Sequence, residues 1–377
     1  MTDSTGLEAP RYGTASLADL GPSVLAALGV PGEPNPLDLP PSRRACVLLV
    51  DGLGWNALLA NRAHAPFLAS LAETSDPITA GFPTTTATSL TTLGTGAAPG
   101  HHGVFGYAVA IPGGDEVLNQ LSWSPKVDPV TWQPHRTTYQ RAEAAGLTTA
   151  YVAPGRFEGS AFTRASARGG RYVPAENITE LVVKAEAALA AAERGYVFVY
   201  HSDLDSFGHV HGVDSPYWRH HLGHVDRLAE QLAAALPPDA ALYVTADHGM
   251  VDVPPESRID VETDPGLAAG VRVLAGEARV RHVYARPGAA ADVLAAWRER
   301  LAGRATVVTR GEAVRRGWFG PVEEGFLPRI GDVLAVAHGD TALVAPVSER
   351  FEAGFAGQHG SLTPSELRVP LLRTSPR

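Results

Sequence analysis

Short apolar runs recur along the chain, and stretches with helical periodicity separate them. The runs at Cys46 to Val50 and Tyr196 to Tyr200 are uninterrupted, which is typical of strands buried on both faces of a parallel sheet, and further strands are expected at Thr148 to Val152 and Ala241 to Ala246. Strand and helix alternate through this part of the chain. The pattern predicts an α/β fold with a doubly wound, mostly parallel central sheet and helices on both of its faces.

The stretches between these runs have the apolar spacing of helices. A further strand is expected at Ile78 to Phe82, and a turn at Gly100 to Gly106. The expected helices are Leu17 to Leu28, Asp51 to about Glu73, Thr138 to Ala145, Glu180 to Arg194 and Pro216 to Leu236.

A later part of the chain is rich in loops. Within it, Val280 to Ala285, Ala289 to Leu301 and Thr306 to Val308 follow a strand, helix and strand pattern, which predicts a small inserted α+β cap. The central fold is expected to resume with Asp332 to Ala337 and Thr341 to Val344. The predicted divisions are a lead-in at 1–42, the first part of the core at 43–250, the cap at 251–329 and the closing part of the core at 330–377.

Composition is that of an ordinary globular protein, with 45% hydrophobic and 19% charged residues. The formal net charge of -9 argues against a broad basic surface for nucleic acid or an anionic membrane. The N-terminal residues have neither a basic nor an apolar leader region, and no run is long enough to span a bilayer, which predicts a cytoplasmic location. The single cysteine, Cys46, is expected to pack in the core.

Hydroxyl side chains gather behind Pro83 in the stretch from Gly81 to Gly96. Taken alone, such a cluster is most simply a helix cap or a turn. A helix that begins inside the stretch would direct free backbone N–H groups, and the positive end of its dipole, toward whatever lies before Thr86. Phosphate is the ligand that such a helix start favours.

Carboxylate and imidazole side chains follow three of the predicted strands, and a late loop adds one more histidine. Because the ends of strands lie side by side in a doubly wound sheet, these groups can meet in one crevice. A lone aspartate after a strand is more often a helix cap, but the full set is hard to obtain by chance. The set consists of Asp51, Asp205 with His209, Asp247 with His248, and His359.

The donor types indicate which metal such a crevice would hold. Aspartate oxygen mixed with histidine nitrogen suits zinc, with manganese or iron as possible substitutes. Three aspartates would cancel three of the four positive charges of two divalent ions, leaving about one to stabilise a bound anion. Two ions roughly 4 Å apart can also hold both the entering and the leaving oxygen of an in-line displacement.

Several motifs, taken together, resemble the alkaline phosphatase superfamily, and within it the nucleotide pyrophosphatase/phosphodiesterase branch. The resemblance covers roughly residues 43 to 250 and 330 to 370. The motifs are Val-Asp51-Gly, Phe-Pro83-Thr-Thr-Thr86, Pro99-Gly-His-His102-Gly, Asp205-Ser-Phe-Gly-His209, Asp247-His248-Gly-Met and His359-Gly.

The resemblance implies roles for these residues. Thr86 would be the nucleophile, since coordination to a metal activates an otherwise weak hydroxyl, and it would form a phosphothreonine intermediate. Water activated by the second ion would hydrolyse that intermediate. The implied ligands are Asp51, Asp247, His248 and the Thr86 hydroxyl for one metal, and Asp205, His209 and His359 for the other.

Two positions in the candidate substrate-binding region depart from the family pattern. Nucleotidases of the family carry an aromatic residue directly after the nucleophile and an asparagine three residues after it. This chain has Ala87 and Ser89 there. The metal chemistry should survive both changes. The resemblance therefore does not imply that a nucleotide is the preferred substrate of this chain.

Other histidines offer alternatives to this ligand set. His211 could replace His209, although the spacing from Asp205 favours His209. His220 and His224 stand one helical turn apart but are expected on a solvated helix face. His102 is expected to shape a turn. Tyr107 and Trp123 either line a substrate cleft or, more simply, pack in loops.

These features predict an enzyme, a metal-dependent phosphoric ester hydrolase. Its expected activity is that of a two-zinc phosphodiesterase or nucleotide pyrophosphatase acting on a small phosphorylated substrate. A phosphomonoesterase using the same site is the alternative within enzymes. A catalytically inactive protein that binds phosphorylated ligands through its metals is the alternative from another class. The oligomeric state stays open.

Overall fold

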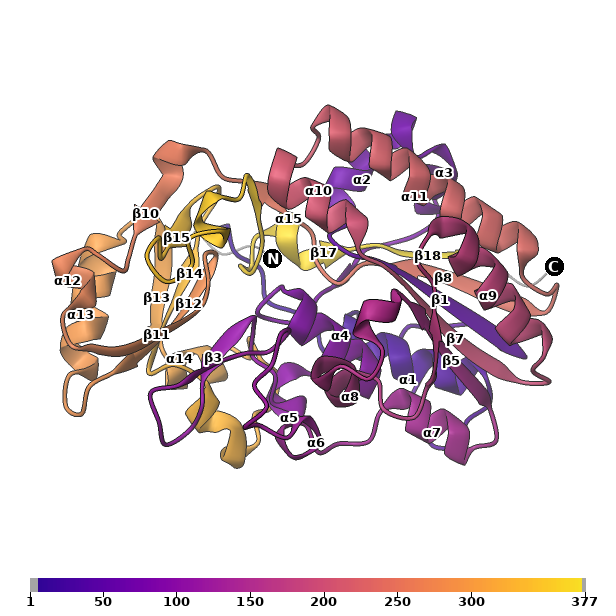
Figure 1. Ribbon diagram of the computed structural model, residues 1–377, viewed down its shortest axis with the longest axis horizontal. Helices are drawn as coiled ribbons and strands as arrows, with labels where there is room; N and C mark the ends of the chain where they lie inside the picture. Colours follow the sequence, from indigo (N-terminus) through magenta and orange to yellow (C-terminus); the bar gives the residue numbers. More distant parts are fainter. Residues whose placement is uncertain (1–5, 375–377) are drawn as a thin grey trace.

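A parallel sheet of six strands forms the centre of the molecule, whose computed structural model describes residues 6–374 (Figure 1). The first five residues, on which part of the leader argument rests, lie outside this range, as do residues 375–377. All strands are parallel except the edge strand β18. In spatial order the strands are β18 (Leu371–Thr374), β8 (Ala240–Thr245), β1 (Arg44–Val50), β7 (Gly195–His201), β5 (Thr148–Ala153) and β6 (Arg171–Pro174).

Helices cover both faces of this sheet, as the alternating pattern predicted (Figure 1). One face carries α9 (Ile178–Ala190), α11 (Pro216–Ala235) and α3 (Pro66–Ala72). The other carries α1 (Leu17–Ala27), α4 (Thr86–Thr95) and α7 (Thr138–Ala144). The doubly wound, mostly parallel α/β fold is therefore confirmed.

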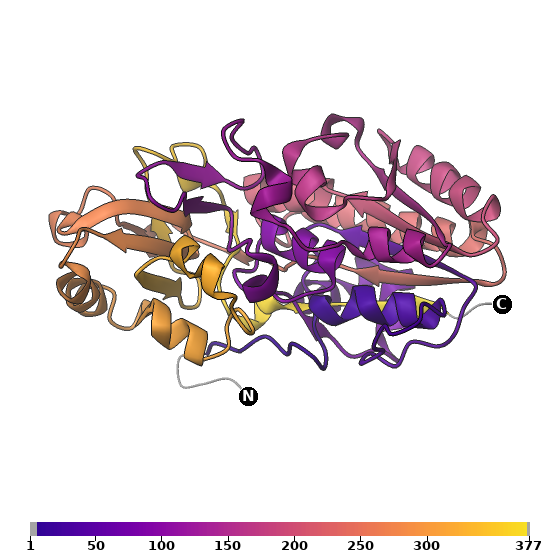
Figure 2. The same ribbon diagram turned by 90° about the horizontal axis from the view of Figure 1, so that it is seen from below.

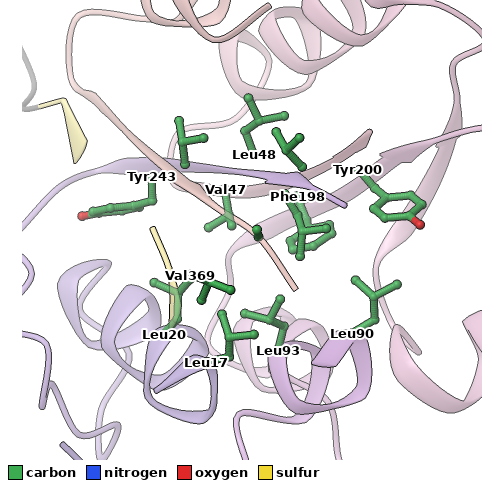
Figure 3. Close-up of a cluster of buried hydrophobic side chains, with 14 of the residues drawn as sticks. Leu17, Leu20, Val47, Leu48, Leu90, Leu93, Phe198, Tyr200, Tyr243 and Val369 are labelled. Atoms are coloured by element: carbon green, nitrogen blue, oxygen red, sulfur yellow. The ribbon is translucent and has the colours of Figure 1, made fainter. Parts of the chain in front are cut away.

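The N-terminal segment is part of the core and not a lead-in to it. Leu17 and Leu20 of α1 are fully buried and pack beside Leu93 of α4, beneath Val47 of β1 (Figure 3). Burying side chains of this size stabilises a fold by roughly 1.5–3 kcal/mol each. The predicted core position of Cys46 is also observed.

A second sheet lies beside the first and forms the smaller unit of the molecule (Figure 2). Its strands, in order, are β11 (Val271–Glu277), β12 (Val280–Ala285), β14 (Val333–Ala337) and β13 (Ala305–Thr309). The helix α13 (Ala290–Arg300) connects β12 to β13, as the predicted strand, helix and strand pattern required.

The boundary expected at residue 329 is wrong in one respect. Strand β14 pairs with β12 and β13 and so belongs to the second sheet, and β15 (Ala342–Val344) pairs with β10 (Arg258–Asp260). Both had been assigned to the resuming core, because a short apolar run does not show which sheet it joins. The second unit, which we call the cap, therefore includes residues beyond 329.

Two predicted elements differ in detail. The helix expected from Asp51 to Glu73 is broken before Pro66, because proline cannot continue a helix from the residues preceding it. Of the strand expected at Ile78 to Phe82, only β2 (Ile78–Thr79) forms, and it pairs with β17 (Arg368–Val369) outside the main sheet. The edge strands β6 and β18 are short and partly polar, and the apolar pattern did not predict them.

None of the helices within residues 6–374 combines the length and the apolar character that crossing a membrane requires.

Short elements complete the chain. The remaining elements are α2 (Trp55–Ala60), η1 (Arg62–His64), α5 (Pro99–His102), β3 (Ala108–Ala110), β4 (Val117–Asn119), α6 (Pro129–Trp132), η2 (Gly155–Phe157), α8 (Ala161–Ser166), α10 (Asp203–His211), β9 (Val251–Asp252), η3 (Pro255–Ser257), α12 (Pro265–Ala268), α14 (Arg310–Arg315), η4 (Glu324–Arg329), η5 (Glu352–Gly354), β16 (Gly357–Gln358) and α15 (Pro364–Leu367).

Candidate active site

The register of the three central strands brings their ends to one edge of the sheet. Val50 of β1 pairs with His201 of β7, and Leu49 pairs with Thr245 of β8. Asp51 follows β1 directly, Asp247 comes two residues after the end of β8, and α10, which carries Asp205 and His209, begins two residues after β7 ends. The sequence-predicted carboxylates therefore meet at the carboxyl edge, where doubly wound sheets bind ligands.

A glycine allows the close approach between two of these strand ends. Gly52 has a φ of +75°, a region that residues with a side chain rarely adopt. A Cβ atom there would also lie 3.1 Å from the Cβ of Asp205. Glycine is thus required directly after Asp51 if Asp205 is to lie beside it.

The threonine run forms the start of a helix, as predicted. Thr85 is the N-cap of α4, with extended backbone, and Thr86 is the first helical residue. The backbone N–H groups of the first turn have no partner within the helix and lie at the positive end of its dipole. Thr86 is partly exposed, whereas the hydroxyl residues around it are buried.

The late histidine reaches the site through two sets of contacts. Strand β16 pairs with β9, which follows His248 closely in the chain, and His359 comes directly after β16. Thr84 fixes the loop from the other side: its backbone N–H donates to the Gly360 carbonyl at 3.1 Å, and its hydroxyl donates to the Ser361 carbonyl at 2.7 Å. The loop that precedes Thr86 and the loop that carries His359 are thus held together.

The candidate ligands form two groups. In the first, His248 Nε2 lies 3.5 Å from Asp51 Oδ1, 3.3 Å from Asp247 Oδ2 and 3.3 Å from the Thr86 hydroxyl. In the second, His209 Nε2 lies 3.3 Å from Asp205 Oδ2 and 3.2 Å from His359 Nε2. Within each group the carboxylate and imidazole ligand atoms lie within 4.8 Å of one another, close enough to share one ion.

All three imidazoles are oriented in the same way. The Nδ1 atoms of His209, His248 and His359 lie 2.8, 3.1 and 2.9 Å from backbone carbonyls of Gly357, Gly249 and Thr84. A carbonyl only accepts, so Nδ1 must carry the proton and donate it. In a neutral imidazole Nε2 then has a lone pair, which here is aimed into the site, the arrangement found in histidines that bind metals.

The carboxylates leave unpaired oxygens in the same space. Asp51 Oδ1, Asp205 Oδ1 and Asp247 Oδ2 are buried without a hydrogen-bond partner among the described residues. Burial, together with the charges of Asp247 and Asp205, raises the pKa of Asp51 well above its usual value. Such a cluster needs compensating positive charge, and the residues present fit two divalent cations.

Thr86 lies where two cavities meet. One cavity of about 320 Å³ opens toward the cap and is lined by Tyr107, Glu277 and Phe355. The other, of about 380 Å³, lies on the side of β5 and β7 and is lined by Arg156 and several aromatic side chains. Asp205 also borders both cavities, so a group bound at Thr86 has room on either side.

The predicted substrate-binding residues occupy less exposed positions. Ala87 and Ser89 are completely buried in the first turn of α4, and neither lines the two cavities. Their neighbour Thr86 lines both. Substrate-binding roles for Ala87 and Ser89 stay predictions. Of the two aromatic candidates, Tyr107 lines the cap-side cavity, whereas Trp123 donates its indole N–H to the Val127 carbonyl.

The alternative histidines lie elsewhere. His211 is exposed and stacks on Tyr217, with the ring centroids 4.0 Å apart. His102 is buried, accepts the Val104 backbone N–H at Nδ1 and lies 2.9 Å from the Thr92 hydroxyl, so it shapes the turn as expected. His220 is exposed on α11.

Two site residues escaped the sequence analysis. Tyr200, the penultimate residue of β7, donates its hydroxyl to Asp51 Oδ2 at 2.5 Å. In the sequence it was one more apolar strand residue. Glu277 reaches the cavity from the cap, where no motif marked it, and its Oε1 is buried without a partner within the described chain. Burial raises the pKa of Glu277 to about 8, although a hydrogen bond from Thr85 opposes the shift.

The raised pKa of Glu277 predicts how the stability of the metal-free protein depends on pH. Glu277 holds its proton up to about pH 8 when folded and loses it near 4.5 when unfolded. Between these values the folded state binds more protons, so its free energy of unfolding falls as the pH rises, by up to about 1.4 kcal/mol per pH unit. In Glu277→Gln the free energy of unfolding should decrease less steeply with pH than in wild type. Urea unfolding from pH 5 to 8 measures it, with the exposed Glu186→Gln as control; equal slopes in wild type and Glu277→Gln would contradict the prediction.

Fold and site together place the chain in the alkaline phosphatase superfamily, with the predicted residues gathered at the expected edge of the sheet. The family model described as type I phosphodiesterase / nucleotide pyrophosphatase matches residues 45–362. The chain belongs to this family.

Solved structures with the same fold agree with that assignment. Murine ectonucleotide pyrophosphatase / phosphodiesterase 5, an inactive variant in complex with AMP, is 18% identical, with a TM-score of 0.68 over 89% of this chain and 88% of the other. Phosphonoacetate hydrolase from Sinorhizobium meliloti 1021, in complex with phosphonoformate, is 19% identical, with a TM-score of 0.66 over 89% and 91%.

A curated relative matches part of the chain. The phosphopentomutase of Methylobacterium radiotolerans is 33% identical over 166 residues. The match spans 44% of this chain and 40% of the relative's length.

Proposed function

We propose that the protein is a zinc-dependent phosphodiesterase that acts through a phosphothreonine at Thr86. The observation that carries the proposal is the position of Thr86 between two cavities. A phosphodiester has two substituents, and each cavity can hold one of them while the phosphate lies at the start of α4. A monoester would use only one cavity.

The two ligand groups would each hold one zinc ion. Asp51, Asp247, His248 and the Thr86 hydroxyl would bind the first, and Asp205, His209 and His359 the second. When bound, the ions would lower the pKa of the Thr86 hydroxyl and stabilise negative charge on the phosphate oxygens. Mixed carboxylate and imidazole donors support zinc as the metal.

The chain's own groups would carry out two displacements. The Thr86 oxygen forms a bond to phosphorus as the bond to one alcohol breaks, and that alcohol leaves through its cavity. The first-turn N–H groups of α4 donate to the non-bridging oxygens, whose charge increases in the transition state. Water then cleaves the phosphothreonine, restores the threonine hydroxyl and releases the remaining phosphate ester.

A comparison of two substrates tests the proposal. Zinc-loaded protein should hydrolyse bis-p-nitrophenyl phosphate with a kcat/KM at least about tenfold higher than that for p-nitrophenyl phosphate, because only the diester fills both cavities. Chelation should abolish the activity, and added zinc should restore it. Faster turnover of the monoester would favour a phosphomonoesterase. Isomerisation of a pentose phosphate without hydrolysis would favour an activity like that of the phosphopentomutase relative.

A further inference from the structure

A third group of possible metal ligands lies outside the candidate active site. His201 is the last residue of β7, Asp203 is the first residue of α10, and His221 lies on α11. One ligand atom from each lies within 4.8 Å of the others. They line a cavity of about 460 Å³, to which His224 also contributes. His224 lies three residues after His221 on α11, and the centroids of the two rings are 5.7 Å apart.

The buried imidazole of His201 and the half-buried imidazole of His221 face each other through nitrogen atoms. His201 Nε2 and His221 Nε2 are 2.8 Å apart, and the rings are nearly parallel, with an interplanar angle of 9°. Two nitrogens at this distance can share only one proton, so at least one of them presents a lone pair. A metal ion would take the place of that shared proton. Tetrahedral zinc, with bonds of about 2.1 Å, needs its ligand atoms roughly 3.4 Å apart, so the rings would separate by about half an ångström.

Neutral imidazole, with a lone pair on one ring nitrogen, is the form that binds a metal. Asp203 is exposed at the rim of the cluster, where its carboxylate can supply negative charge and solvent can deliver an ion.

The position of the group gives such an ion a structural role. The His201 carbonyl accepts the backbone N–H of Asp51 at 2.9 Å, and Asp203 opens the helix that carries Asp205 and His209. An ion held by residues of β7, α10 and α11 would therefore fix the first turn of α10 against α11. Through α10 it would also limit the movement of two candidate catalytic ligands.

We propose that His201, Asp203 and His221 form a third, structural site for a transition metal, with zinc as the best match to its donors. His224 or solvent can complete the coordination from the cavity. The site is distinct from the two catalytic groups, and His201, Asp203 and His221 line neither of the two cavities that meet at Thr86.

Metal analysis of matched variants tests this site. Metal-free protein is loaded with zinc, freed of excess by gel filtration and analysed by mass spectrometry for zinc per chain. His221→Asn and Asp203→Asn, which alter different elements, should each bind one zinc fewer than wild type. His220→Asn changes the adjacent, exposed histidine of the same helix and should bind as many as wild type. The readout is a difference, so it holds whatever number of ions the catalytic groups take.

Cobalt(II) absorption and thermal unfolding give independent readouts. Wild-type protein should show a visible band from a cobalt ion with imidazole ligands that is weakened in His221→Asn, and zinc should raise the Tm of wild type more than that of the variant. The comparison of metal-free proteins shows whether the variants fold. Equal zinc content in wild type, His221→Asn and Asp203→Asn would overturn the proposal, as would an equal loss in His220→Asn.

Discussion

Replacing Thr86 with alanine is expected to lower kcat on a phosphodiester by a factor of about 10³ or more. Thr86 is the one partly exposed hydroxyl residue of the threonine run, lies at the first position of α4, and is 3.3 Å from His248 Nε2. The variant loses the proposed nucleophile, while six of the seven proposed ligands remain. Zinc content and Tm should therefore change little, and steady-state hydrolysis of bis-p-nitrophenyl phosphate measures the loss.

The chain offers a matched control on the same helix. Thr91 is fully buried, and its hydroxyl donates to the Ala87 carbonyl at 2.8 Å, so Thr91→Ala removes the same atoms without touching the cavities. It should keep most of the activity. Wild-type protein quenched in acid during turnover should carry phosphate on Thr86, and Thr86→Ala should carry none. Equal kcat in wild type and Thr86→Ala would remove the nucleophile assignment.

Breaking the ion pair between Arg279 and Glu366 is expected to cost about 3–5 kcal/mol of unfolding free energy. Both side chains are completely buried, and the guanidinium Nε and Nη2 donate to the two carboxylate oxygens at 3.0 and 2.7 Å. Glu366→Gln would leave a buried cation without its partner. Glu366 also accepts the Ser361 N–H at 3.0 Å, so the variant should loosen the loop that carries His359 and weaken zinc binding.

Two comparisons separate this effect from an ordinary loss of charge. Arg298 and Glu312 form a pair in which both side chains are substantially exposed, so Glu312→Gln should cost less than about 1 kcal/mol. The double variant Arg279→Met with Glu366→Leu removes both charges and should be more stable than Glu366→Gln alone. Urea unfolding of the metal-free proteins measures these differences. A cost below 1 kcal/mol for Glu366→Gln would contradict the stabilising role expected for the buried pair.

The central fold was predictable because its signals are local. Each buried strand is a continuous apolar run, and each helix beside it repeats its apolar positions over several turns, so neither depends on distant parts of the chain. The carboxylates at the ends of β1 and β8 followed from the same rule, since strand ends in a doubly wound sheet share an edge. The break before Pro66 was also available from local chemistry.

The cap illustrates what a local signal leaves open. The run from Val333 to Ala337 was recognised as a strand, but its apolar residues fit either sheet. Its partners, β12 and β13, are set by long-range pairing. Glu277 could not be predicted for the same reason. Nothing in the sequence shows that a glutamate at the end of β11 faces Thr85, because this depends on how the cap packs against the core.

The sequence alone determined which residues are candidates for the chemistry: the strand-end aspartates, the threonine at a helix start, and the late histidine were all identifiable from residue type and spacing. Only the tertiary structure decided how they meet. It directed three Nε2 atoms inward by tying each Nδ1 to a backbone carbonyl, put Thr86 between two cavities and moved His221 to within 2.8 Å of His201. The physical reason is that side-chain orientation and cavity shape arise from contacts between segments far apart in the chain, whereas strands, helices and caps depend on neighbouring residues.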